Sequence, residues 1–167
     1  MTTDSNTIQR RLRDGVFVGA AMPSYAQDVP LYVNGVESSL LAETNPLVRA
    51  VILSLFTWRR AEPDDVVEDT KWGWWGDNVS AVENDKIGSR LWLIAREKLT
   101  QSVMNRAVQY AEEALAWFVD DGVATRVTVT AQRIQINGIG LTVTIYRVNQ
   151  PPLELRFSDV WSLINNV

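Results

Sequence analysis

The sequence predicts an α+β fold in which two or three helices pack on a small antiparallel sheet with a C-terminal β-hairpin. Three observations predict it. Apolar residues recur at helical spacing over residues 45–60 and 100–121. Apolar and polar residues then alternate over residues 127–132 and 141–145, which is typical of strands with one buried face. Asn-Gly pairs between short apolar runs, the strongest local hairpin signal, occur twice.

We expect the first 28 residues to form an N-terminal arm and residues 29–167 to form a single α+β domain. Residues 1–14 are polar and charged, as in terminal arms that are partly disordered or docked on a partner. The domain begins with a short hairpin over residues 29–41, which turns at Asn34-Gly35.

The first helix is predicted over residues 45–60. Asn45 is its expected N-cap, and Pro46 occupies the first helical position. We expect the helix to stop before Pro63, because proline restricts the residue before it to extended backbone.

Two more helices are predicted, over residues 89–98 and 100–121. Thr100 is the expected cap of the second of these, and Gly122 is its expected terminator. Its apolar stripe predicts a core face: Val103, Ala107, Val108, Ala111, Ala114, Leu115 and Phe118.

The C-terminal hairpin is predicted to pair residues 127–136 with 139–148 around Asn137-Gly138. Pro151-Pro152 ends it, and residues 153–157 are long enough to add a short strand. The hairpin is long for a small sheet, so its edge is either protected within the domain or used to pair with another chain.

Composition excludes several classes of function. The chain has no cysteine and no histidine, which removes disulfides, thiolate metal sites and Ser-His-Asp catalysis. A net charge of −4 argues against a broad nucleic-acid-binding surface. No apolar run approaches the roughly 18 residues of a membrane span, and we expect a cytoplasmic protein. We predict no catalytic residue, no metal site and no cofactor.

The densest aromatic cluster lies in a long loop over residues 61–85. Trp74 and Trp75 stand between two glycines, Trp72 comes just before the first glycine, and Asp77 follows the second. The tryptophans either anchor a subunit interface or pin the loop to its own core, and the residues favour neither.

An acidic run, residues 62–69, precedes this cluster. It has no calcium-loop spacing, and a catalytic carboxylate pair would need a cleft that sequence does not reveal. A solvated surface is the favoured interpretation.

Five motifs in order resemble the phage Mu-type baseplate protein family of contractile tails, over roughly residues 40–148. The motifs are Leu55-Phe56-Thr57 with Arg59-Arg60-Ala61, Pro63-Asp64-Asp65, Gly73-Trp74-Trp75-Gly76-Asp77, Gly88-Ser89-Arg90-Leu91-Trp92-Leu93, and Ala114-Leu115-Ala116-Trp117 with Asp121-Gly122-Val123-Ala124. The family is similar to lysozyme-like baseplate-wedge and sheath-initiator proteins. Trp58 departs from the pattern, where a small acidic residue is expected, and residues 1–28 match no part of it.

The resemblance implies a structural virion subunit in the tail baseplate, assembled in the host cytoplasm. Implied partners are baseplate wedge proteins and the tail sheath protein, with tail tube or hub proteins as further candidates. The family's symmetry implies several copies in a sixfold ring. Sheath assembly would begin when the sheet accepts strands from sheath subunits, a form of β-augmentation.

The implied contact residues fall into two sets, each with a purely structural alternative. The expected wedge contacts are Arg59, Arg60, Glu62, Trp72, Trp74, Trp75 and Asp77. The expected sheath-pairing residues are Leu141, Val143, Ile145 and Arg147. The two adjacent arginines could instead compensate a helix C-terminus, and arginines along the hairpin could simply protect its edge.

Two other functions stay open from the sequence. The lysozyme-like relatives and the acidic run would suit a cell-wall hydrolase, which would need one protected acid in a cleft. The other possibility is a tail-assembly chaperone that is absent from the mature particle.

Overall fold

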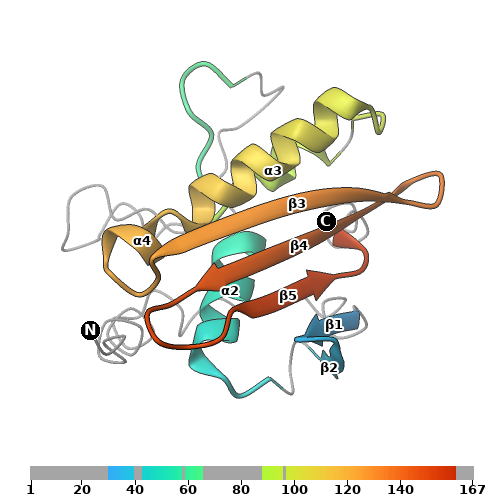
Figure 1. The fold of residues 1–167 in the computed structure, drawn as a ribbon. Coiled ribbons are helices and arrows are strands. Elements are labelled where there is room, and N and C mark those ends of the chain that lie inside the picture. The colour runs from blue at the N-terminus through green and yellow to red at the C-terminus, as the bar shows by residue number, and fades with distance from the viewer. Residues whose placement is uncertain (1–29, 40–42, 58, 66–87, 96, 161–167) are drawn as a thin grey trace.

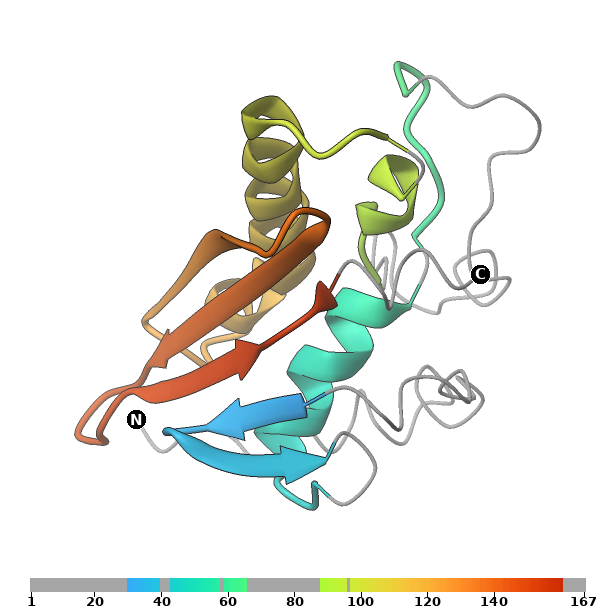
Figure 2. The same cartoon turned by 90° about the vertical axis from the view of Figure 1, so that its right-hand side faces the viewer.

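The computed structural model describes residues 30–39, 43–57, 59–65, 88–95 and 97–160. They form the predicted α+β fold, with helices on one face of a five-stranded antiparallel sheet (Figures 1 and 2). The strand order is β2 (Val36–Ser39), β1 (Pro30–Val33), β5 (Leu153–Phe157), β4 (Gly138–Tyr146), β3 (Arg126–Ile134). The two long helices are α2 (Pro46–Phe56) and α3 (Gln101–Leu115).

The core lies between the sheet and these helices. Alternation along the strands sends one set of side chains into it, and the strand residues with no exposed surface are Leu31, Leu141, Val143, Ile145, Leu155 and Phe157. Phe56 of α2 meets Phe157 of β5 edge to face, with ring centroids 5.5 Å apart. The opposite face of β3 and β4 carries threonines, and Thr128 and Thr130 stand across from Thr144 and Thr142.

The first hairpin forms as predicted. Asn34 and Gly35 have φ angles of 49° and 80°, and two consecutive positive φ values characterise the type I′ turn that Asn-Gly favours. Asn34 also joins this hairpin to β5: its N–H donates to the Glu154 carbonyl at 2.8 Å, and its Oδ1 accepts from the Glu154 N–H at 2.8 Å.

The C-terminal hairpin also forms, but its turn differs from the prediction. Ile134 pairs with Gly138, so residues 135–137 make the turn, and the positive φ (54°) falls on Gln135. Gly138 is buried in β4, where a Cβ would lie 2.6 Å from the Ile134 carbonyl oxygen. Glycine is therefore required here for the close approach of two strands and not for the turn.

Helix α2 begins as predicted and ends earlier. The Asn45 side chain accepts from the Leu47 N–H at 3.0 Å, and Pro46 opens the helix. The predicted end at residue 60 is wrong, because the helix stops at Phe56. Thr57 is already extended, and its carbonyl accepts from the Ser89 N–H at 2.9 Å. The helix therefore ends at a contact with a distant segment and not at Pro63.

The predicted helix over residues 89–98 is largely wrong. Among the described residues of this range the short 3₁₀ helix η3 (Leu91–Ile94) forms instead, and Ser89 lies before it in the bridge to Thr57. Helix α3 begins as predicted, with the Thr100 hydroxyl accepting from the Val103 N–H at 3.3 Å. It breaks at Ala116, and the short α4 (Trp117–Asp120) follows, with Gly122 two residues after its end at a φ of 72°.

Replacing Asn45 with alanine should lower the free energy of unfolding by about 1 kcal/mol, because the first turn of α2 loses its cap. Thermal or urea unfolding checks this. Asn105→Ala is the control: Asn105 accepts only an exposed hydrogen bond from Gln101 within α3, so its loss should cost less than about 0.5 kcal/mol. Equal effects would contradict the capping role.

Candidate interaction surfaces: an ion network and an open strand edge

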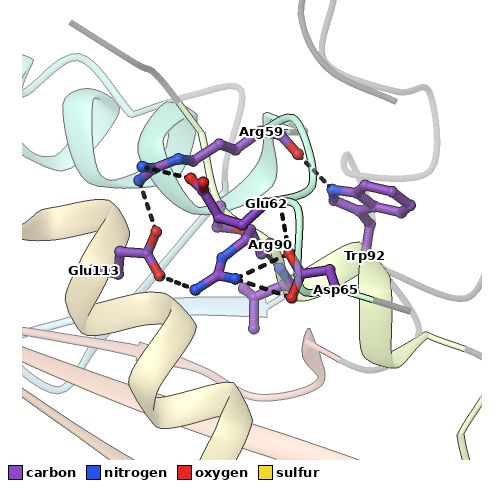
Figure 3. A network of polar contacts seen from close by, with 8 residues as sticks. Arg59, Glu62, Asp65, Arg90, Trp92 and Glu113 are labelled. Atoms are coloured by element: carbon purple, nitrogen blue, oxygen red, sulfur yellow. Dashed lines mark hydrogen bonds and ion pairs between the residues drawn. The ribbon is translucent and has the colours of Figure 1, made fainter. Parts of the chain in front are cut away.

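An ion network joins three separate parts of the chain beside α3 (Figure 3). Glu113 of α3 accepts from two arginines, Arg59 at 2.9 Å and Arg90 at 2.6 Å. Arg90 also reaches both oxygens of Asp65, at 3.0 and 2.9 Å. Glu62 lies 3.5 Å from Arg59. The planar guanidinium of Arg90 thereby links two carboxylates from different elements.

Backbone contacts hold the arginines in place. The Arg59 N–H donates to the Ser89 carbonyl at 3.0 Å, and the Trp92 indole donates to the Arg59 carbonyl at 2.8 Å. The Ser89 hydroxyl donates to the Leu55 carbonyl at 2.5 Å. Beside it, Gly88 has φ = 96° and lies so near Thr57 that a Cβ would stand 2.3 Å from the Thr57 oxygen. The end of α2 and the start of η3 are therefore in backbone contact.

The centre of the network is largely shielded from solvent. The side chains of Arg90 and Asp65 are only 14% and 13% exposed. Burial alone lowers the pKa of Arg90, but its hydrogen bonds to Glu113 and Asp65 outweigh that effect and raise the pKa. The Tyr110 ring also lies below this guanidinium, with 4.7 Å between its centroid and Cζ. Arg90 therefore stays protonated at any pH used for the protein.

The network sits at the base of the segment that contains the tryptophan cluster. Asp65 is the last described residue before residues 66–87, and Gly88 is the first after them. The Asp65–Arg90 ion pair and the Thr57–Ser89 bridge bring the two ends of that segment together.

The predicted wedge contacts divide into three groups. Arg59 and Glu62 lie in the network and pair within their own chain, and Arg59 lies outside the helix in which it was predicted. Arg60 is exposed. The remaining predicted contacts lie outside the described residues: Trp72, Trp74, Trp75 and Asp77. The acidic run is also not uniformly solvated, since Asp65 is an internal partner.

The predicted sheath-pairing residues lie on or just after an interior strand. β4 is paired with β3 along its whole length and with β5 from Leu141 to Ile145. Leu141, Val143 and Ile145 are fully buried, while Arg147 follows the strand and is partly buried. A strand from a partner therefore needs a different edge from that of β4.

The five-stranded sheet of the described residues ends at β2 on one side and at β3 on the other, and β3 is the longer of the two edge strands. Its nine residues pair with β4 without a bulge, and its centre, residues 127–132, has no charge, glycine or proline. Arg126 and Arg133 flank the centre, but each contacts a group of its own chain. Arg126 lies over the Tyr146 ring at 4.0 Å, and Arg133 donates to the Leu99 carbonyl at 2.6 Å. The usual protections of an edge strand are therefore absent from this centre.

The family model for phage protein GP46 matches residues 47–152, which contain the whole ion network, β3 and β4. The chain belongs to the GP46 family. The match leaves out the β1–β2 hairpin and β5, which complete the sheet at its other side.

Two curated relatives are similar to this GP46 protein. The Mu-like prophage FluMu protein gp46 of Haemophilus influenzae is 36% identical over 131 residues, which cover 78% of this chain and 89% of that protein. The baseplate protein gp46 of Escherichia phage Mu is 39% identical over 102 residues, which cover 59% of this chain and 68% of that protein. No solved structure gives a significant match.

Sequence reasoning missed most of the ion network in this GP46 protein. Asp65 and Arg90 belong to two of the motifs on which the resemblance rests, but their separation in the sequence does not indicate that they form an ion pair. Glu113 lies on the polar side of a helix and resembles an ordinary solvated charge. Among the described residues, no group of three or more potential ligands is placed to hold a metal ion. None of the described helices has both the length and the apolar character to cross a bilayer.

Proposed function

We propose that this protein is a structural, non-enzymatic subunit of a phage tail baseplate. The observation that carries the proposal is its similarity to the phage Mu protein named as a baseplate protein, over most of that protein's length. The GP46 match across the ion network and both long strands supports the same role. A packed α+β body with a fixed loop base and an open strand edge suits a part that joins other subunits.

Within the baseplate of a contractile tail, we propose that β3 receives a strand from the sheath protein. An edge strand presents every second N–H and C=O outward, and added strands gain affinity from these groups. β3 suits this because its centre is uncharged and its register is regular. Leu141, Val143 and Ile145 would support the edge from the core instead of touching the partner.

The wedge contact would form at the other candidate surface. The ion network fixes both ends of residues 66–87, so Trp72, Trp74, Trp75 and Asp77 would be presented from one place, beside exposed Arg60. Large aromatic side chains are the commonest anchors of protein interfaces. Arg59 and Glu62 would act by holding this base, and a sixfold ring would repeat the contact around the tail.

A charge placed on the edge strand tests the sheath contact. Thr128→Lys should reduce the number of sheathed tails in a complementation assay on the order of tenfold, the effect of losing roughly 1.4 kcal/mol of binding. Thr144→Lys is the matched control, because Thr144 stands directly across from Thr128 but on interior strand β4, with Glu154 on its other side. Sheathed tails at normal frequency in Thr128→Lys would refute strand acceptance at β3.

Cryo-electron microscopy of purified tails tests the location. We expect density for this chain between the wedge and the first sheath ring, with β3 extended by a strand of another subunit. If the protein is absent from mature particles but needed for assembly, it is a chaperone and the structural proposal is wrong.

A further inference from the structure

Arg147 is a partly buried arginine without a partner among the described residues. It directly follows β4, and its buried Nε meets no acceptor. Arg59 and Arg90 also have an unbonded Nε, but their terminal nitrogens hold carboxylates. No ion pair neutralises the charge of Arg147 among the described residues, and a carboxylate that reached the terminal nitrogens of its guanidinium would form a charge-assisted hydrogen bond.

We propose that Arg147 binds the carboxylate of a glutamate that a partner strand brings to the edge of β3. The inference rests on the strand acceptance proposed above, and it adds which residue reads the incoming strand and what chemistry it reads.

The position of Arg147 fits this role. Tyr146 stands across from Arg126, the first residue of β3, and the Tyr146 carbonyl accepts from both the N–H and the hydroxyl of Thr125, at 2.8 and 3.0 Å. Arg147 therefore lies at the end of the sheet where β3 begins. A strand added outside β3 would run about 10 Å from β4, two strand spacings away. An extended arginine and an extended glutamate together span that separation, whereas a shorter aspartate reaches less far.

Charge favours a partner other than a second copy of this chain. β3 has no acidic residue and carries Arg126 and Arg133, so pairing two copies of β3 would bring only further positive charge to the edge. A strand with a glutamate at the end nearest Arg126 is complementary to Arg147. Its centre should alternate as β3 does, with apolar residues beside Val127, Val129 and Ala131 and polar residues beside the threonines.

Peptide binding to the full-length protein tests the proposal. The probes are nine-residue alternating valine–threonine peptides with blocked ends and a glutamate at either the first or the last position. Each is compared with its glutamine and aspartate counterparts by fluorescence anisotropy. We expect one of the two glutamate peptides to bind about tenfold more tightly than its glutamine counterpart, and the aspartate peptide to fall between them. The position that gains affinity gives the strand direction.

Two variants assign the preference to Arg147. Arg147→Gln should bind glutamate and glutamine peptides equally, and Arg147→Glu should prefer a lysine-ended peptide. Arg156→Gln is the control, because Arg156 lies on β5, with its guanidinium 4.5 Å from the Tyr32 ring centroid, and should keep the preference for glutamate. Circular dichroism confirms that each variant is folded.

The outcomes separate this inference from the proposed function. Equal binding of glutamate and glutamine peptides to the unmodified protein overturns the role of Arg147 and leaves strand acceptance intact. No binding of any peptide, including at high concentration, overturns both. A peptide with a fully N-methylated backbone lacks the N–H donors of a strand, and if it binds as well as its parent, the site is not a strand edge. A dimer that Thr128→Lys dissociates would identify a second copy as the occupant and overturn the inference.

Discussion

Replacing Gly88 with alanine should lower the free energy of unfolding by about 4 kcal/mol, which is a large loss for a single substitution. Two effects combine. At φ = 96° an L-residue is strained, and the new Cβ would meet the Thr57 carbonyl oxygen at 2.3 Å. Because that oxygen is backbone, relief requires separating the end of α2 from the start of η3. The Thr57–Ser89 bridge and the ion network beside it would then weaken together.

Gly122→Ala is the matched control for this variant. Gly122 also has a positive φ, 72°, but a Cβ there would meet nothing within 4 Å. Only backbone strain remains, and the expected loss is about 1 kcal/mol. Urea unfolding followed by circular dichroism measures both free energies of unfolding. Similar losses in the two variants would show that the close approach of Gly88 to Thr57 adds nothing to the free energy of unfolding beyond backbone strain.

Replacing Arg90 with alanine should cost about 3 kcal/mol, at the low end for breaking a buried ion pair because Glu113 is 28% exposed. The loss arises mainly from the partners left behind. Asp65 would lose both of its hydrogen bonds to Arg90, and Glu113 would keep only Arg59. The double variant Arg90→Ala with Asp65→Asn should therefore be more stable than the sum of the two single losses predicts.

Arg106→Ala serves as the control for Arg90→Ala. Arg106 pairs with Glu97, but the two side chains are 36% and 40% exposed, and a pair at the surface contributes less than about 1 kcal/mol.

The pKa of Arg90 is raised, so the stability that its ion pairs contribute is fully present below the ordinary pKa of arginine and is lost only as the pH rises through the raised value. The difference between the two variants should therefore stay constant from about pH 7 to about pH 9. Equal losses for Arg90→Ala and Arg106→Ala would contradict a structural role for the network.

Local signals in the sequence were enough for the parts of the fold that depend on neighbouring residues. Asn34-Gly35 determined the first hairpin because both residues tolerate positive φ. Asn45 and Thr100 marked the starts of α2 and α3 because their side chains cap nearby N–H groups. Alternation along β3 and β4 revealed which side chains face the core.

Contacts between distant residues could not be predicted in the same way. The end of α2 depends on Thr57 meeting Ser89, and nothing near residue 57 signals that bridge. The place of β4 inside the sheet depends on β5, so the predicted pairing residues fell on a strand with both edges occupied. Arg59 and Arg60 look alike in sequence, yet only Arg59 reaches a carboxylate on α3.

The strand order also determines when the sheet can be completed during synthesis. β1 pairs with β5, and Asn34 bonds to Glu154, 120 residues later in the chain. During synthesis the β1–β2 hairpin cannot pair with the rest of the sheet until β5 has left the ribosome, because β5 is the strand that joins it to β4. Truncated products of translation would lack this closure and keep the edges of β1 and β4 unpaired. Only chains that extend through β5 can join the two parts of the sheet, so the strand order makes the whole sheet depend on a segment that is synthesised late.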